Sequence, residues 1–220
     1  MSTHLNKEID ELKNRLLTLC SIVEDKLWLA VKSINDQDAD LAKKVMESDM
    51  DIDNMEVDVE EECLKILALH QPVAIDLRFI ITALKINNDL ERIGDLAVNI
   101  AERSCFLSSQ KSVGTFFDFE TMATKTQTML KRSIDSLVNI DGELAAEVCR
   151  DDDEVDALNR QMYQQVKEQV IKKPENIEVL IHLLSVSRHL ERIADHATNI
   201  AEDVIYMIKG EIVRHKTEIY

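Results

Sequence analysis

The chain has 220 residues, of which 42 are acidic and 26 basic, and its formal net charge is −16 at pH 7. This negative balance argues against a nucleic-acid-binding protein, because few phosphate contacts could form and little counterion release would follow. It favours cations and basic protein surfaces as partners. Glycine (4), proline (2) and aromatic residues (4%) are scarce. The remaining composition, rich in leucine, isoleucine, alanine, glutamate and lysine, predicts an all-α fold.

The cysteines and the amino terminus indicate where the protein works. No C-x-x-C pair is present, and the amino-terminal stretch MSTHLNKEIDELKNR is polar rather than a signal peptide. Apolar runs such as RFIITAL are too short to span a bilayer. We therefore expect a soluble cytoplasmic protein with four reduced thiols, at Cys20, Cys63, Cys105 and Cys149.

Three helices are predicted in the first half of the chain. Apolar residues at helical spacing indicate a helix over residues 4–34, which the polar stretch 35–40 interrupts. The next helix is predicted over residues 38–69 and must close before Pro72, which cannot continue it. A third helix is predicted over residues 74–106.

The second half repeats this pattern after a break. The stretch LSSQKSVGTFFDFE, residues 107–120, lacks helical periodicity and is the best candidate for a boundary. A helix over residues 119–138 follows and breaks near Gly142. The fifth helix runs to Pro174, and the sixth ends near Gly210, a plausible C-terminal cap.

A duplicated segment supports two related units. LERIGDLAVNIAER (residues 90–103) and LERIADHATNIAED (residues 190–203) are identical at ten of fourteen positions, with an offset of 100 residues. Each unit holds three long helices, which is enough to bury a stripe of its own. We predict two tandem, pseudo-symmetric, antiparallel three-helix bundles, residues 1–108 and 115–220. A single six-helix bundle is the main alternative.

The duplicated segment carries acidic residues on one helical face. At about 100° per residue, Glu91 and Asp95 project to an outer strip of their helix, away from the core position Leu90. Glu191 and Asp195 do the same in the second unit. The spacing of four residues places the two carboxylates of each pair about one helical turn apart.

The neighbouring helix brings further acids to the same height. If the first hairpin turns at Pro72, then Glu91 and Asp95 lie level with residues 54 and 50, next to Asp53 and Asp49. The two helices are therefore predicted to line one external groove.

The second hairpin repeats this arrangement. If it turns at Pro174, then Glu191 and Asp195 come level with residues 157 and 153, next to Asp156 and Asp152.

Converging carboxylates repel one another and raise each other's pKa unless a cation relieves them. Oxygen-rich clusters suit hard cations, iron or manganese. We therefore interpret Glu91, Asp95, Asp49, Asp53, Glu191, Asp195, Asp152 and Asp156 as candidate metal ligands. The alternative is a solvated helical face on which Arg92 and Arg192 pair with the acids.

Other motifs are weaker. The sequence contains no Glu-x-x-His, H-E-x-x-H, G-x-S-x-G or glycine-rich phosphate loop, so catalytic residues are not predicted. His196 projects away from the acidic strip and is interpreted as a spectator. Leu77, Ile81 and Leu84 form an apolar strip on the outer face of their helix, which is typical of a partner or subunit contact unless a loop covers it.

The whole chain resembles the PhoU family. The stretch from Asn35 to Arg103, NDQDADLAKKVMESDMDIDNMEVDVEEECLKILALHQPVAIDLRFIITALKINNDLERIGDLAVNIAER, is similar to the first repeat of that family. SRHLERIADHATNIAEDVIYMIKGEIVRH, from Ser187 to His215, is similar to the end of the second repeat.

The resemblance implies two three-helix bundles and a cytoplasmic, usually dimeric, negative regulator of the phosphate-starvation response. Such a regulator connects the ATPase subunit of a phosphate ABC transporter to a phosphate-sensing histidine kinase, and it meets the membrane only through those complexes. Family members also hold metal ions through two E(D)-x-x-x-D motifs, which fall here on Glu91/Asp95 and Glu191/Asp195. Iron, zinc, manganese, nickel and magnesium are the candidates.

Two rivals remain open, a carboxylate metalloenzyme and a metal-buffering helical protein. Substrate turnover that vanished in a Glu91→Ala variant would support the first. Many bound ions per chain, with no partner affinity, would support the second.

Overall fold

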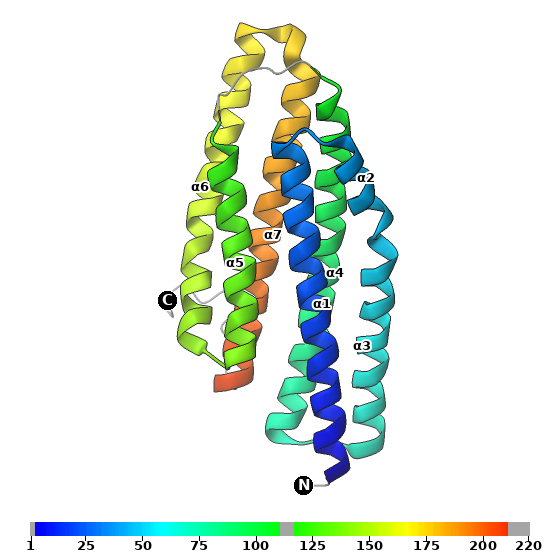
Figure 1. The fold of residues 1–220 in the computed structure, drawn as a ribbon. Helices are drawn as coiled ribbons and strands as arrows, with labels where there is room; N and C mark the ends of the chain where they lie inside the picture. Colours follow the sequence, from blue (N-terminus) through cyan, green and yellow to red (C-terminus); the bar gives the residue numbers. More distant parts are fainter. Residues whose placement is uncertain (1–2, 111–116, 211–220) are drawn as a thin grey trace.

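The computed structural model describes residues 3–110 and 117–210, and in these ranges the backbone is helical without any strand (Figure 1). The all-α prediction is confirmed. The elements are α1 (Thr3–Asn35), α2 (Ala39–Glu47), α3 (Asp49–His70), α4 (Ala74–Ser108), α5 (Phe119–Asn139), α6 (Gly142–Lys172), η1 (Pro174–Asn176) and α7 (Ile177–Lys209). None of the helices described is both long and apolar enough to cross a membrane.

Side-chain caps set several of the helix boundaries. Asp38 accepts hydrogen bonds from two backbone N–H groups at the start of α2, and Asp141 does the same for α6. Asp118 accepts one from the backbone of Thr121 at the start of α5. These carboxylates satisfy N–H groups that have no partner within the helix. At the other end of α7, Gly210 adopts the left-handed conformation (φ 72°), as the sequence predicted.

The predicted helix over residues 38–69 is in fact two helices that meet at Ser48. The backbone of Ser48 leaves helical geometry (φ −86°, ψ 12°), and its hydroxyl donates a hydrogen bond to the carbonyl of Val45 at 2.9 Å. Such a bond offers the backbone an alternative to the helical pattern and favours a bend. The apolar stripe nevertheless continues across the break from Val45 to Ile52, and both of these residues are buried.

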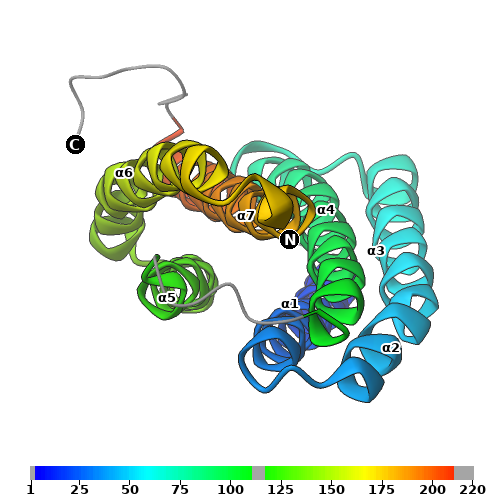
Figure 2. The same cartoon turned by 90° about the horizontal axis from the view of Figure 1, so that it is seen from above.

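The two halves of the chain meet along α4 and α7. In both views α4 and α7 lie side by side, with α3 beyond α4 and α6 beyond α7 (Figures 1 and 2). Helices α1 and α5 lie on one common side of this central pair, α1 against α4 and α5 against α7 (Figure 2). The predicted units 1–108 and 115–220 stay a prediction, and residues 111–116 of the predicted boundary lie outside the described residues.

One hydrophobic core runs through both halves. Buried side chains at helical spacing on α1, such as Leu12, Leu16 and Leu19, pack with those of α4, and their counterparts on α7 include Leu190 and Ile193. Burying each such side chain contributes about 1.5–3 kcal/mol. The duplicated segments thus turn their apolar sides inward and leave their acidic sides available at the surface.

Polar contacts cross the α4–α7 interface as well. Lys85 donates a hydrogen bond to Asp203 at 3.0 Å, and Nδ1 of His196 lies 2.8 Å from Oδ1 of Asp89. Asp203 and Asp89 are both buried. His196 does turn away from the acidic strip, as the helical projection predicted, and its ring instead contacts Asp89 in the other half of the molecule.

Candidate functional site: two acidic grooves

The first group of acids lies where α3 packs against α4, with Asp53 and Glu56 on α3 close to Glu91 and Asp95 on α4, and it is called here the first acidic groove. Burial raises the pKa of Glu91, and the negative charges of Asp95, Glu56 and Asp53 raise it further, while the neighbouring Arg92 opposes them. These four acids are therefore electrostatic neighbours, as the hairpin geometry predicted for Asp53, Glu91 and Asp95. The side chain of Asp49, also predicted here, lies outside the described residues.

A glycine brings the two helices of this groove close together. A Cβ atom on Gly94 would lie 2.9 Å from Cδ1 of Ile52, which is closer than real Cβ contacts come. Gly94 sits between Glu91 and Asp95 on α4, and Ile52 precedes Asp53 on α3. The missing side chain thus lets the acids of α3 approach those of α4.

The second acidic groove lies between α6 and α7 and contains Asp152, Asp156, Glu191 and Asp195. Burial raises the pKa of Asp152, and so does Asp156, while a hydrogen bond from the Thr198 hydroxyl at 3.3 Å opposes them. The predicted set is thus brought together in this half.

Asp195 shows the crowding most clearly. Its partial burial, followed by the charges of Glu191, Asp152 and Asp156, raises its pKa to about 6. Mutual repulsion of this size is what a bound cation would relieve.

Arginines also contact the acids, so the solvated-face alternative holds in part. Nε of Arg92 lies 3.3 Å from Glu91, and its Nη1 lies 3.5 Å from Asp95. On α6, Arg160 donates a hydrogen bond to Asp156 at 3.0 Å. These arginines are more than half exposed, and exposed pairs of this kind contribute little stability.

The donor set of each groove fits a hard cation in kind, since it consists of carboxylate oxygens with raised pKa values. The side chains, as they are placed, do not form a complete metal-binding site. Within residues 3–110 and 117–210, no three His, Cys, Asp or Glu side chains are placed so that they could hold one metal ion together. The structure therefore brings the predicted acids into common grooves, and coordination would require side-chain rotation within them.

Two contributors to the grooves were not among the predicted site residues. Glu56 belongs to the first groove, where burial, Glu60 and Asp53 raise its pKa. Thr198 belongs to the second groove through its bond to Asp152. Each stands three residues after a predicted acid, Asp53 or Asp195, and this helical spacing places it on the same face as that acid.

The apolar strip on α4 is less exposed than predicted. Leu77 is 39% exposed, but Ile81 is half-buried and Leu84 packs against the hydrophobic core. The prediction of a continuous exposed strip over these three residues is therefore wrong, because Leu84 belongs to the core.

Comparison with protein families finds a match to the family model described as the PhoU domain, over residues 16–104 and again over residues 119–204. A protein of Aquifex aeolicus (strain VF5) named phosphate-specific transport system accessory protein PhoU homolog is 40% identical over 212 residues, which cover 96% of each chain. The Escherichia coli (strain K12) protein named phosphate-specific transport system accessory protein PhoU is 32% identical over 215 residues, 98% of this chain and 89% of that one.

Solved structures share the fold. The crystal structure of PhoU from Pseudomonas aeruginosa superimposes with a TM-score of 0.91 and 35% identity, and the match covers 94% of this chain and 99% of that chain. The phosphate transport system regulatory protein PhoU from Streptococcus pneumoniae gives a TM-score of 0.84 at 26% identity, over 95% of this chain and 99% of that one.

Proposed function

The chain belongs to the PhoU family, and on that premise we propose that it is a cytoplasmic negative regulator of the phosphate-starvation response. It would act without catalysis, as a homodimer, by contacting the ATPase subunit of a phosphate ABC transporter and a phosphate-sensing histidine kinase. The observation that carries the proposal is the similarity to phosphate transport accessory proteins over nearly the whole chain.

The proposed regulation would work by shifting the kinase between its active and inhibited states. A regulator that binds the inhibited state of a kinase more tightly than its active state moves the equilibrium toward inhibition, by no more than the difference in affinity. Long, rigid helices with a charged surface suit such a role, since they present fixed faces to two partners at once. The −16 net charge favours basic surfaces on those partners.

We propose further that the two acidic grooves bind metal ions. The support is the convergence of acids from paired helices in both halves, with raised pKa values at Glu91, Asp152, Glu191 and Asp195. In the first groove Asp53, Glu91 and Asp95 would hold the ion, with Asp49 as a further candidate. In the second groove Asp152, Asp156, Glu191 and Asp195 would do so. A bound cation would neutralise the repulsion and fix the paired helices relative to each other.

The regulatory proposal is tested with membranes that carry the phosphate transporter. The tagged protein should retain the transporter ATPase above the level of an unrelated acidic helical protein. Added to the purified kinase, it should lower the ratio of phosphorylated to unphosphorylated response regulator. Equal retention by the unrelated protein, together with an unchanged ratio, would refute the proposal.

The metal proposal is tested by metal analysis of protein purified without chelator. The wild type is compared with a variant in which Glu91, Asp95, Glu191 and Asp195 are all alanine. Metal content should fall in the variant, and equal content would remove the site assignment. A metal buffer, the second candidate that the acidic grooves favour, would instead bind many ions per chain and retain no partner.

A further inference from the structure

A seam runs between α1 and α5 on the side of the α4–α7 pair where both helices lie (Figure 2), and among the described residues three hollows follow it. One hollow opens at its lower end near Ile9 and Ile140, and two more follow toward Asn35 and Glu120. The two upper hollows share Trp28 and Gln127, so they are adjacent. We call this surface the α1–α5 seam. Its walls come from both halves of the chain.

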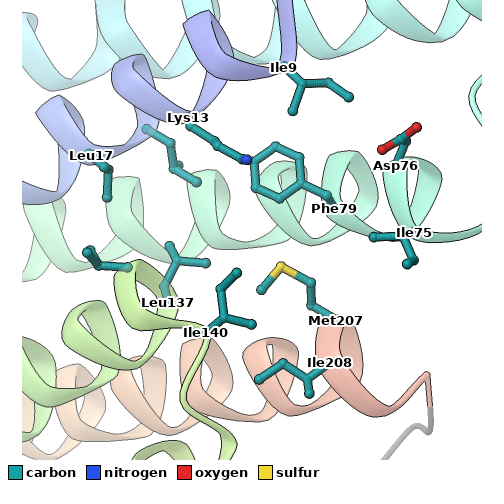
Figure 3. A pocket seen from close by; sticks show the side chains of 12 residues that line it. Ile9, Lys13, Leu17, Ile75, Asp76, Phe79, Leu137, Ile140, Met207 and Ile208 are labelled. Atoms are coloured by element: carbon teal, nitrogen blue, oxygen red, sulfur yellow. The ribbon is translucent and has the colours of Figure 1, made fainter. Parts of the chain in front are cut away.

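The lower hollow is apolar. It is a cavity of about 260 Å³ between α1, α4, α5 and α7. In Figure 3 the side chains of Leu17, Phe79, Leu137, Ile140 and Met207 point toward one open space. Leu137 and Met207 are buried at its floor, whereas Leu17 and Ile140 are exposed. A concave apolar surface with exposed side chains usually marks a contact with another molecule.

The upper hollows centre on the single tryptophan of the chain. Trp28 is 52% exposed, and the cavities on its two sides measure about 270 Å³ each. The ammonium group of Lys32 lies over the Trp28 ring, 4.8 Å from its centre. Tryptophan is the residue type most enriched among energetically dominant interface positions.

Between the apolar lower end and Trp28, acids outnumber bases in the seam, with Glu24, Asp25 and Asp135 against Lys131. Burial raises the pKa of the half-buried Glu24, and Asp135 raises it further from across the seam. Asp25 adds to this effect, and Lys131 offsets only part of it. Like charges that face each other across a contact are unfavourable. Packing of α1 against α5 alone therefore does not explain why these carboxylates face each other.

Ile140 adds a backbone observation. It ends α5 in the left-handed conformation (φ 54°) and is 62% exposed at the lower hollow. A β-branched residue is an outlier there, because its side chain crowds the backbone where glycine would fit. The chain thus holds a strained apolar side chain in the mouth of an apolar cavity, which is more often found at functional surfaces than elsewhere.

We propose that the α1–α5 seam binds one amphipathic helix of a partner protein, with apolar side chains at its two ends and a lysine or arginine facing Glu24 and Asp135. The inference deepens the proposed function, on which it rests for the existence of a protein partner. Helices commonly dock in apolar grooves through anchors at regular spacing. The basic residue would add to the charge of Lys131, which faces the three acids Glu24, Asp25 and Asp135.

The dimensions set the register of this helix. Eleven residues separate Leu17 from Trp28 on α1, or about 16 Å at 1.5 Å per residue. A docked helix would therefore carry apolar anchors three turns apart and the basic residue between them, about seven residues from the anchor at the Leu17 end. From Ile9 to Asn35 the seam accommodates roughly 25 helical residues.

A second copy of this chain is a poorer occupant. A two-fold dimer places the same patch of each copy against the other. Centred on the seam, that pairing would set Glu24, Asp25 and Asp135 of both copies at the same level, and the two chains each carry −16. Like charges in such a contact are unfavourable, whereas a basic helix would relieve them.

The test uses Trp28 as the reporter in the full-length protein. A 25-residue synthetic helical peptide carries leucines at positions 5, 9, 16 and 20 and lysines at 12 and 13, and a matched peptide carries glutamates at 12 and 13. Titration should shift the Trp28 emission to shorter wavelength with the lysine peptide, which should bind about tenfold more tightly than the glutamate peptide.

Matched variants separate the seam from general attraction to an acidic protein. Leu17→Glu changes the seam, and Leu64→Glu makes the same change at an exposed leucine of α3. The first should weaken lysine-peptide binding about tenfold, and the second should leave it unchanged. Glu24→Gln should weaken it severalfold, and circular dichroism confirms that each variant is folded.

Three results would overturn the inference. The first is equal peptide affinity in the Leu17→Glu and Leu64→Glu variants, and the second is an unchanged Trp28 emission at saturation. The third is a dimer in solution that Leu17→Glu, but not Leu64→Glu, converts to a monomer by light scattering, because a second copy would then occupy the seam.

The membrane experiment keeps the two proposals distinct. Leu17→Glu should retain less transporter ATPase or kinase than Leu64→Glu does. If the wild type retains its partners and Leu17→Glu retains them equally, the seam assignment fails and the proposed function stands. If even the wild type retains none, the proposed function fails, and the peptide titration alone decides whether the seam binds a basic helix.

Discussion

Nδ1 of His196 lies 2.8 Å from Oδ1 of Asp89, and this contact joins α7 in one half of the chain to α4 in the other. The amide of Asn199 reaches the same oxygen of Asp89 at 3.4 Å. Asp89 is buried, so truncating either partner leaves a polar group without its hydrogen bond in a poorly hydrated place.

We predict that Asp89→Ala lowers the free energy of unfolding by about 1–3 kcal/mol. His196→Ala should cost a similar amount, and the double variant less than the sum of the two, because they share one interaction. Urea denaturation followed by circular dichroism measures all three. Strict additivity would show that the contact does not couple the halves. Asp36→Ala, at an exposed site outside the interface, is the control.

Metal-free protein should become more stable when Asp195 is replaced by asparagine. Partial burial and the neighbouring acids Glu191 and Asp152 disfavour the ionised form of Asp195, which is the form present at pH 7 in both folded and unfolded chains. Because much of the side chain reaches solvent, the gain should be small, roughly 0.5–1 kcal/mol. Thermal unfolding in the presence of a chelator measures it.

The effect of Asp195→Asn on stability should change from stabilising to destabilising when metal is bound. With a divalent ion in excess, the wild type should gain more stability than Asp195→Asn, because it has the additional ligand. Glu154→Gln, an exposed acid of α6 that pairs with Lys125, serves as the control for a change of net charge. A loss of stability in the metal-free Asp195→Asn variant would contradict the account of crowding.

Acid should weaken the contact between the start of α1 and the end of α3. Burial opposes ionisation of Glu8, but a hydrogen bond with His70 at 2.6 Å and the charge of Lys65 outweigh it, so the pKa of Glu8 is lowered from its usual 4.5. A carboxyl with a lowered folded-state pKa stabilises the fold above the unfolded-state value, and this contribution is lost as the pH falls through the folded-state value.

Glu8→Gln should therefore be less stable than the wild type at pH 6, and the difference should shrink as the pH falls below 4.5. Urea midpoints at pH 6, 5, 4 and 3 measure it. Glu11→Gln provides the comparison, since Glu11 is half-exposed and lies 3.7 Å from Lys7 in a surface pair. A difference that stayed constant with pH would indicate a packing effect rather than the ionised contact.

The sequence was sufficient for most helix boundaries because caps and helix breakers act locally. Pro72, Gly142 and Gly210 each mark a helix end that the structure places within a few residues. The break at Ser48 was not predictable from periodicity, because Val45 and Ile52 are seven residues apart, as in an unbroken helix. The side-by-side packing of α4 and α7 was also missed, since a helical projection describes one helix and not its tertiary neighbour.

The acidic grooves were predictable for a related reason. A tight antiparallel hairpin fixes which residues are level with each other, so Asp53 could be matched to Glu91, and Asp156 to Glu191, from the turn alone. Side-chain rotation is not fixed by such arithmetic. Whether the carboxylates close around one ion therefore depends on rotamers that the pattern of residues does not specify.

Replacing Ile140 should increase the stability of the protein and weaken binding at the α1–α5 seam. Glycine fits the left-handed backbone of this position without crowding, so Ile140→Gly should raise the free energy of unfolding by about 1 kcal/mol. It also removes an exposed apolar side chain from the lower hollow, and affinity for the lysine peptide should fall. Gln71→Gly is the matched control, because Gln71 ends α3 in the same conformation (φ 47°) away from the seam. That variant should gain stability and keep the affinity of the wild type, and a parallel loss of affinity in both variants would show that Ile140 has no role in docking.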